Sequence, residues 1–330
     1  MIEVRDLKVH YGDTVAVDGI SFEVKTGEVY GLIGPNGAGK TTTIKAIATL
    51  LEPTYGEILA NGVSVLHEPE KVRGCLGYMP DFPPVYEDLR VGEFVELFAA
   101  AYGMPEAEGR TEVDRCLAVT NLSDKRDILC KTLSRGMKQR ALLAKTLVHD
   151  PPILLLDEPA ANLDPKARID LRNLLKQLAK DGKTILVSSH VLAELQDLCD
   201  SIGIMRRGKL VIDGKLEEVV EQATPSQTKK LQLELLHSFP TAHAIILKNP
   251  KAHLPEDVEA SATRLEINFD GDESEVAALL RVLVEAGAPL TSFHQQKADV
   301  EKLFLAVEAG KETARNPSPS ESPPAETNQP

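Results

Sequence analysis

The stretch GPNGAGKTT, from Gly34 to Thr42, is the part of the chain that decides the fold. It fits the pattern G-x-x-x-x-G-K-[ST], with the apolar run VYGLI directly before it and a helix-forming run after it. Glycines at positions 34, 37 and 39 allow the backbone to curl so that successive N–H groups point at one anion. A strand, a loop and a helix in this order predict a phosphate-binding loop, and a structural turn that binds nothing is the alternative.

The residues that follow the loop predict how the phosphates are held. A helix that starts near Gly39 presents the positive end of its dipole, and Lys40 places a point charge on the β- and γ-phosphates. Thr41 offers a hydroxyl oxygen to Mg²⁺, which prefers oxygen ligands. We count Lys40 among the catalytic residues as well as among the binding residues. The expected nucleotide contacts in this segment are Gly34, Pro35, Asn36, Gly37, Ala38, Gly39, Lys40, Thr41 and Thr42.

A second motif, ILLLDEP, ends a buried apolar strand in the two carboxylates Asp157 and Glu158. In an open parallel sheet, ligands bind beyond the carboxyl ends of the strands, so these acids are expected to face the phosphate loop. Asp157 is suited to hold Mg²⁺ through its water shell, and Glu158 is placed to orient and polarise an attacking water. The alternative is an acidic pair that caps the following segment, although four consecutive apolar residues rarely lead into a surface cap.

The composition of the chain disfavours several classes of protein and kinds of site. The chain has 330 residues with 37 basic and 50 acidic side chains, a net charge of −13, which argues against wrapping nucleic acid or binding an anionic membrane by charge. Its four cysteines form no C-x-x-C pair, which indicates reduced, structural thiols and not a zinc or redox site. No apolar run approaches the ~18 residues that span a bilayer, so we expect a soluble chain without direct membrane insertion.

The order of patterns predicts an α/β fold with several parts. Short alternating strands over the first sixty residues predict a small antiparallel layer, and later apolar strands separated by helices, Cys75–Met79 and Ile153–Leu156 among them, predict a parallel sheet. The helix after the phosphate loop is expected to end at about Leu51, and a last helix is expected at 299–310. A further helix is indicated by apolar residues at helical spacing, Val91, Phe94, Val95, Leu97, Phe98 and Ala101. We expect a nucleotide-binding domain over 1–221 with a helical lobe at about 85–150. A linker at 222–228, a small α+β accessory domain at 229–310 and a disordered tail at 311–330 complete the prediction.

Three further segments give the chain a resemblance to a known family. LSRGMKQR at Leu133–Arg140, ANLDP at Ala161–Pro165 and the SSH that ends in His190 occur in this order after the phosphate loop. Together with the two motifs above, they resemble the nucleotide-binding subunit of an ATP-binding cassette (ABC) transporter over roughly Ile2 to Asp213. In that family these segments are the signature sequence, the D-loop and the switch histidine. The resemblance implies a P-loop NTPase fold, with ATP and Mg²⁺ as cofactors.

The resemblance also implies roles for residues that a lone phosphate loop does not need. Ser134 and Gly136 open a helix and would bind the γ-phosphate of ATP held by a second cassette, so that two cassettes close head-to-tail around two nucleotides. Asp164 would link the two sites across this dimer. His190 would contact the γ-phosphate and help position the water, and Tyr11 would stack on adenine.

The chain departs from the common family pattern at two positions. Asp81 in GYMPDF stands where most cassettes have glutamine; a carboxylate can still approach Mg²⁺ or the water, but it donates no hydrogen bond when ionised. Arg135 stands where glycine is frequent. Neither change removes a group needed for hydrolysis, and an active ATPase is expected. The resemblance further implies that the segment Asp81–Leu89 receives the permease, with Phe82, Val85 and Tyr86 as its apolar floor; a plain loop between domains is the alternative.

By analogy with the family, the chain is expected to be the ATPase subunit of an exporter, on the cytoplasmic face of the membrane through a separate permease. The partners expected are that transmembrane permease and a second cassette, identical or different, and no nucleic acid. The alternative is a soluble ABC ATPase that acts on nucleic acid or the ribosome; the single cassette, the acidic balance and the lack of a heptad run count against it. A regulatory protein without turnover is disfavoured by the intact Lys40, Asp157, Glu158 and His190.

Overall fold

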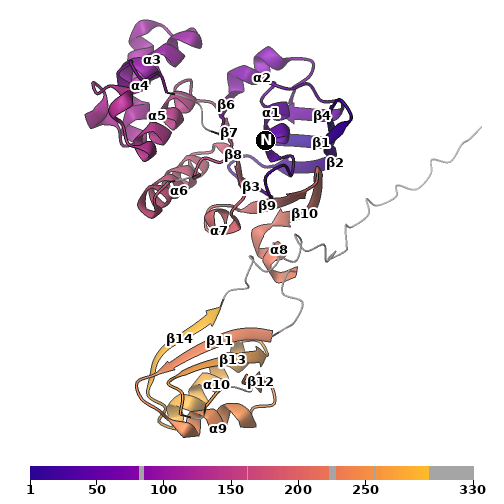
Figure 1. Cartoon of the computed structure of the whole chain (residues 1–330), viewed down its shortest axis with the longest axis vertical. Helices are drawn as coiled ribbons and strands as arrows, with labels where there is room; N and C mark the ends of the chain where they lie inside the picture. The colour runs from indigo at the N-terminus through magenta and orange to yellow at the C-terminus, as the bar shows by residue number, and fades with distance from the viewer. Residues whose placement is uncertain (82–84, 162, 223–227, 256–257, 260, 297–330) are drawn as a thin grey trace, which may run out of the picture.

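Three sheets organise the chain in the computed structural model, which describes residues 1–81, 85–161, 163–222, 228–255, 258–259 and 261–296 (Figure 1). The first two sheets and the helices around them occupy the chain up to residue 222, and the third lies beyond residue 227. Across the described residues, no helix combines the length and the apolar character needed to cross a bilayer.

The central sheet has the strand order β10-β9-β3-β8-β7-β6, and all its neighbours are parallel except the pair β9 and β10. Every residue of β3, β7 and β8 is buried, as expected for a parallel sheet with both faces covered. The strands are β3 (Val29–Ile33), β6 (Leu76–Met79), β7 (Ile153–Leu156), β8 (Thr184–Ser189), β9 (Ser201–Arg206) and β10 (Lys209–Lys215). This sheet confirms the predicted parallel α/β core.

An antiparallel sheet of order β2-β1-β4-β5 forms the predicted N-terminal layer. Its buried side chains include Ile20, Phe22 and Val24, which alternate with exposed neighbours along one strand, so one face packs on a core and the other meets solvent. The strands are β1 (Ile2–Tyr11), β2 (Thr14–Val24), β4 (Tyr55–Ala60) and β5 (Val63–Ser64).

The helices that accompany the first two sheets, outside the predicted lobe, are α1 (Lys40–Ile47), α2 (Pro69–Cys75), α6 (Pro165–Lys180), α7 (Leu192–Leu195) and α8 (Leu216–Gln222). Two sequence expectations need correction here. The helix after the phosphate loop ends at Ile47, not near Leu51, because Thr49 adopts a left-handed φ of 61° that stops it. Cys75 ends α2 and does not begin the next strand. All four cysteines are free thiols.

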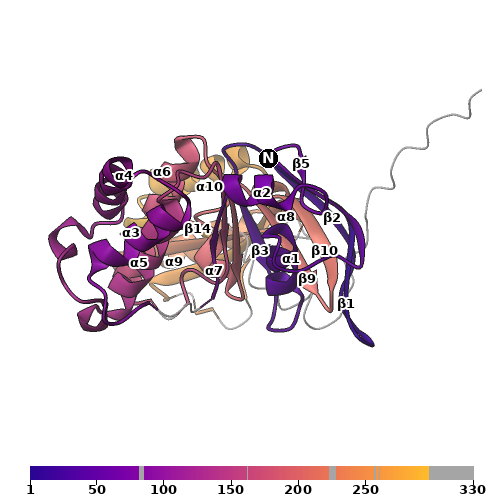
Figure 2. The ribbon, with the colours of Figure 1, turned by 90° about the horizontal axis from the view of Figure 1, so that it is seen from above.

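The predicted helical lobe consists of α3 (Val91–Ala101), α4 (Glu106–Val119) and α5 (Arg135–Leu147), with short 3₁₀ turns at Ser123–Lys125 and Cys130–Thr132. Figures 1 and 2 both show these three helices grouped on one side of the central sheet, with the antiparallel sheet on the opposite side. Phe94 and Val95 of the predicted stripe are buried in the lobe, whereas Leu97 is exposed.

The joint before the lobe differs from the expectation of an apolar floor. Val85 is buried in the core, so it offers no surface for a partner, while Tyr86 is exposed and meets the edge of Phe94 with ring centroids 6.0 Å apart. Phe82 lies outside the described residues.

The third sheet, of order β12-β13-β11-β14, is antiparallel and packs with two helices around a core of its own. Its elements are β11 (Thr228–Leu235), α9 (Pro240–Lys248), β12 (Ala252–His253), β13 (Arg264–Asp270), α10 (Glu273–Glu285) and β14 (Leu290–Gln296). This is the predicted α+β class. The predicted last helix at 299–310 and the tail at 311–330 lie outside the described residues, so the boundaries of the accessory domain stay a prediction.

Candidate active site

A cavity of about 420 Å³ opens where the parallel strands of the central sheet end. It brings together residues that are far apart in the sequence: the phosphate loop, Asp81 after β6, Glu158 after β7 and His190 after β8. The lining residues are Thr14, Val15, Ala16, Asn36, Gly37, Ala38, Gly39, Lys40, Thr41, Thr42, Asp81, Glu158, Ala161 and His190. The cavity therefore lies at the carboxyl ends of the parallel strands, which is the edge of the sheet where the site was predicted.

Close backbone approaches explain two of the loop glycines. A Cβ atom on Gly34 would stand 2.4 Å from the carbonyl oxygen of Met205, which is far inside van der Waals contact. Gly39 has a φ of 108°, and a Cβ atom there would stand 2.7 Å from the carbonyl oxygen of Ala16. Gly39 is also the N-cap of α1, so the positive end of this helix begins at the cavity, as anion binding requires.

Lys40 is buried with its ammonium group between the loop and the second motif. Its Nζ donates a hydrogen bond to the carbonyl oxygen of Gly34 at 2.7 Å and lies 3.4 Å from Oε1 of Glu158. The side chains of Lys40 and Glu158 are only 5% and 9% exposed. A buried cation is thus held at the floor of the cavity, where phosphate oxygens would meet it.

Ser188 holds the two carboxylates in place. Its hydroxyl donates to Oδ1 of Asp157 at 2.6 Å and accepts the backbone N–H of Glu158 at 2.9 Å. Within the described part of the chain, no group hydrogen-bonds to the buried Oδ2 of Asp157 or Oε1 of Glu158. This Oδ2 of Asp157, the Thr41 hydroxyl and the Asp81 carboxylate are oxygen ligands of the kind that Mg²⁺ prefers, so the residues present fit that ion.

His190 contacts Glu158 from the end of β8. Its Nδ1 lies 2.8 Å from Oε2 of Glu158, and its side chain is 47% exposed at the mouth of the cavity. The contact fixes the ring against the carboxylate that is expected to orient the water, and it leaves the other ring nitrogen directed away from Glu158.

Asp81 lies in the electrostatic field of the same group. Burial raises the pKa of its carboxyl, the negative charges of Asp157 and Glu158 raise it further, and Arg135 and His190 oppose the shift. Burial, with the same kind of help from Asp157 and Asp81, raises the pKa of Tyr78 to about 12. Asp81 lines the same cavity as Glu158.

Six of the predicted binding residues do not line this cavity: Gly34 and Pro35 at the start of the phosphate loop, and Tyr11, Ser134, Gly136 and Asp164. Tyr11 is half exposed at the end of β1, and residues 14–16 across the hairpin line the cavity instead. Ser134 and Asp164 cap α5 and α6 by accepting hydrogen bonds from Met137 at 3.4 Å and Ala167 at 2.9 Å. Gly136 packs near Ala167, where a Cβ atom would meet the alanine at 3.5 Å.

Sequence reasoning missed Ser188 and the β2 residues of the cavity. Ser188 was visible as the first serine of the SSH motif, but its role follows from the pairing of β7 with β8, which sets Leu156 beside Val187 and so Asp157 beside Ser188. The β2 residues Thr14, Val15 and Ala16 belong to no sequence motif, because they only line one wall of the cavity.

The fold and the cavity define a P-loop ATPase. A family model for the ABC transporter matches residues 17–161. The Nod factor export ATP-binding protein I of Ralstonia nicotianae is 32% identical over 308 residues, which cover 93% of each chain. The linearmycin resistance ATP-binding protein LnrL of Bacillus subtilis is 30% identical over 307 residues, 92% of this chain and 97% of that protein.

Solved structures agree with these relatives. An ATP-binding subunit of an ABC transporter is 36% identical with a TM-score of 0.61, covering 67% of this chain and 92% of its own. A dimeric cassette, MJ0796 in a post-hydrolysis state with ADP and Pi, is 28% identical with a TM-score of 0.60, covering 66% and 99%. The chain belongs to the ATP-binding cassette family of ABC transporters, whose members hydrolyse ATP to power transport.

Proposed function

We propose that this chain is the ATP-hydrolysing subunit of an exporter and that Glu158 is its catalytic base. The observation that carries the proposal is the buried group at the end of β7 and β8, where Glu158 meets Lys40 at 3.4 Å and His190 at 2.8 Å. In this arrangement Glu158 would orient the attacking water, Lys40 would bind the β- and γ-phosphates, and His190 would contact the γ-phosphate.

Mg²⁺ would be held by Thr41, Asp157 and Asp81, and when bound it neutralises phosphate charge. Support for this set comes from the unpartnered oxygen of Asp157 and from the position of Thr41 and Asp81 in the same cavity. Tyr11 would stack on adenine from the outer end of β1, where half of its side chain is exposed.

A head-to-tail pair of cassettes is the proposed working unit. Ser134 and Gly136 at the start of α5 and Asp164 at the start of α6 lie outside the chain's own cavity, yet Ser134 opens a helix N-terminus of the kind that binds phosphate. The site of a second cassette would use them. A solved relative of 28% identity, MJ0796, is dimeric, which supports this assembly.

Export through a separate permease is the proposed use of the ATPase. Two relatives similar over more than nine tenths of this chain are named for Nod factor export and linearmycin resistance. A cassette that works with a permease would act as a peripheral protein on the cytoplasmic face of the membrane. Purification of the chain from gently solubilised native membranes should yield a co-eluting multi-span protein; recovery with ribosomes or DNA would favour the nucleic-acid alternative.

Glu158→Gln tests the catalytic assignment. The amide keeps the size of the side chain but is a poor base, so we expect retained ATP binding, a stable ATP-bound dimer and a loss of turnover of about a hundredfold or more. Glu57→Gln on β4, whose side chain is 52% exposed, is the control and should match the wild type. If Glu158→Gln hydrolyses ATP at the wild-type rate, the assignment is wrong.

A further inference from the structure

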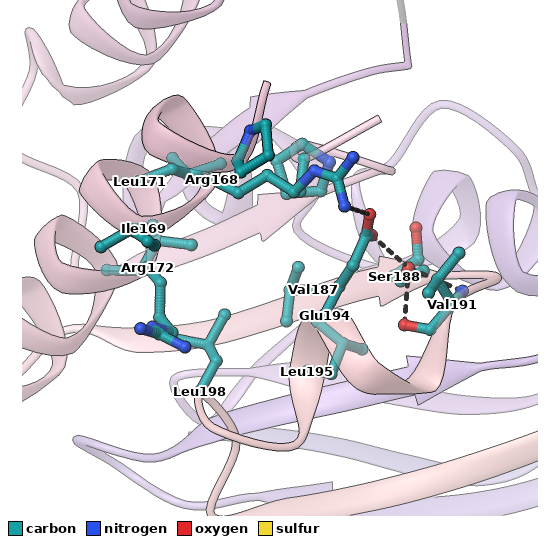
Figure 3. Close-up of a pocket in the computed structure, with 15 residues that line it drawn as sticks. Arg168, Ile169, Leu171, Arg172, Val187, Ser188, Val191, Glu194, Leu195 and Leu198 are labelled. Carbon is teal, nitrogen blue, oxygen red and sulfur yellow. Dashed lines mark hydrogen bonds and ion pairs between the residues drawn. The ribbon is translucent and has the colours of Figure 1, made fainter. Parts of the chain in front are cut away.

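A polar network built on Glu194 connects α6 with the segment that carries His190. The Glu194 side chain is 11% exposed, its Oε2 accepts the hydroxyl proton of Ser189 at 2.9 Å, and its Oε1 lies 3.5 Å from a guanidinium nitrogen of Arg168. Figure 3 shows the Arg168 guanidinium directed at the Glu194 carboxylate, with dashed lines leaving Glu194 toward both neighbours.

The Ser189 end of the network fixes the backbone on both sides of His190. The hydroxyl oxygen of Ser189 accepts the backbone N–H of Val191 at 3.0 Å, which closes a tight turn around His190. The Ser189 carbonyl accepts the N–H of Gly34, the first residue of the phosphate loop, at 3.3 Å. The position of the His190 ring, and hence its 2.8 Å contact with Glu158, depends on this turn.

The Arg168 end reaches the loop before α6. Its Nε donates to the carbonyl oxygen of Leu163 at 3.0 Å, while Nη1 faces Glu194. Leu163 directly precedes Asp164, the N-cap of α6. One guanidinium therefore holds both the loop at Asp164 and the turn at His190, which the fork of donors on arginine can do and a single ammonium cannot.

Apolar burial brings these two segments together, and the polar network adds directional contacts between them. A cavity of about 270 Å³ lies between them, lined by apolar side chains such as Leu171, Val187, Leu195 and Leu198 (Figure 3). Leu195 of α7 is buried in one core with Leu171 and Val187, but because apolar burial is not directional, it does not by itself set the conformation of the turn at His190. The polar network at the edge of the cavity supplies the defined geometry.

We propose that Glu194 and Arg168 are positioning residues that set the His190 ring against Glu158 and tie this setting to the loop at Asp164. The proposal rests on the proposed function, since it assigns importance to the His190–Glu158 contact. It goes beyond that function in naming two residues that touch neither nucleotide nor water and in giving the path by which a change at Asp164 reaches His190.

Steady-state ATPase assays on the full chain test the proposal with two variants. Glu194→Gln removes the ion pair with Arg168. Arg168→Lys keeps the positive charge but removes the guanidinium donors that contact both Glu194 and the carbonyl of Leu163. Because small misplacements of a catalytic group can cost up to about a hundredfold in rate, we expect kcat to fall about tenfold in each variant, with KM for ATP changed less than about twofold. Arg172→Lys is the control: it lies on the same helix and lines the same cavity, but pairs with Asp197 at 2.8 Å. It should keep the wild-type kcat.

The ring of His190 gives a second readout that a loss of stability alone would not move. Its ¹H–¹³C NMR signal, assigned by its absence in His190→Gln, should shift in Glu194→Gln and Arg168→Lys and stay in place in Arg172→Lys. An unmoved signal, or a wild-type kcat in both variants, overturns the proposal. If Glu194→Gln fails to fold, Arg168→Lys decides, since its side chain is 45% exposed. Full activity of Glu158→Gln would instead overturn the proposed function, while the NMR signal would still report whether the network positions the ring.

Discussion

Replacing Lys40 by methionine should destabilise the protein even without nucleotide. Lys40 Nζ lies 3.4 Å from Glu158 Oε1, and both side chains are less than a tenth exposed. At this distance and an effective dielectric constant of about 20, Coulomb's law gives an attraction of about 5 kcal/mol. Removal of one partner of a buried pair costs about 3–5 kcal/mol, because the other charge is left without compensation. We therefore expect the free energy of unfolding to fall by about 3 kcal/mol.

Urea denaturation followed by circular dichroism in nucleotide-free buffer measures this loss. The double variant Lys40→Met/Glu158→Gln should recover about 2 kcal/mol, because it no longer buries a carboxylate that has lost its ammonium partner and keeps only the contact with His190. Lys138→Met is the control: Lys138 pairs with Glu87 at 3.0 Å, but this pair is solvent-exposed and should contribute less than about 1 kcal/mol. A Lys40→Met variant as stable as Lys138→Met, or a double variant no more stable than Lys40→Met, would refute the reasoning.

Two further predictions concern buried groups of the cassette. Burial lowers the pKa of Lys145 from 10.5 to about 8. Between these two pH values the unfolded chain therefore binds one more proton than the folded chain. As the pH increases through this window, the free energy of unfolding of the wild type should rise by about 2–3 kcal/mol relative to that of Lys145→Met. Urea titrations of both proteins at pH 7.5 and 10.5 check the sign, and a constant difference contradicts it. Gly39→Ala should abolish ATP binding and cost about 3 kcal/mol, whereas Gly37→Ala, which has a φ of 80° and open space around its Cβ position, should cost only about 1 kcal/mol. Calorimetric ATP titration and urea denaturation compare the two, and equal losses would show that the contact with Ala16 does not matter.

Much of the central fold could be predicted because short, buried, apolar strands alternate with helices and each strand carries its chemistry at its end. The strand Ile153–Leu156 was predicted to the residue, since four apolar residues are bounded by prolines on one side and carboxylates on the other. The C-terminal end of α1 could not be predicted, because the run from Ala48 to Leu51 is apolar enough to continue a helix. The left-handed turn at Thr49, with the N–H of Leu50 bonded to the carbonyl of Lys45 at 2.9 Å, stops it.

The site, like the fold, contains residues whose positions could be predicted from the sequence and residues whose positions could not. Lys40, Glu158 and His190 could be predicted to meet, because the carboxyl ends of parallel strands share one edge of the sheet. The bridging hydroxyl of Ser188 depends on strand register, which local pattern does not determine. The prediction for Val85 was wrong for a related reason. Its apolar side chain suggested a surface that binds the permease, but tertiary packing buries that side chain in the core.

The head-to-tail arrangement is tested most directly by mixing two inactive variants, Lys40→Ala and Ser134→Glu. In a mixed dimer of this geometry one site carries both changes, while the other combines an intact Lys40 with the intact Ser134 of the second chain. Random pairing should therefore restore about a quarter of the wild-type ATPase rate, since about half of the dimers are mixed and each has one complete site. A mixture no more active than either variant alone would contradict the shared site.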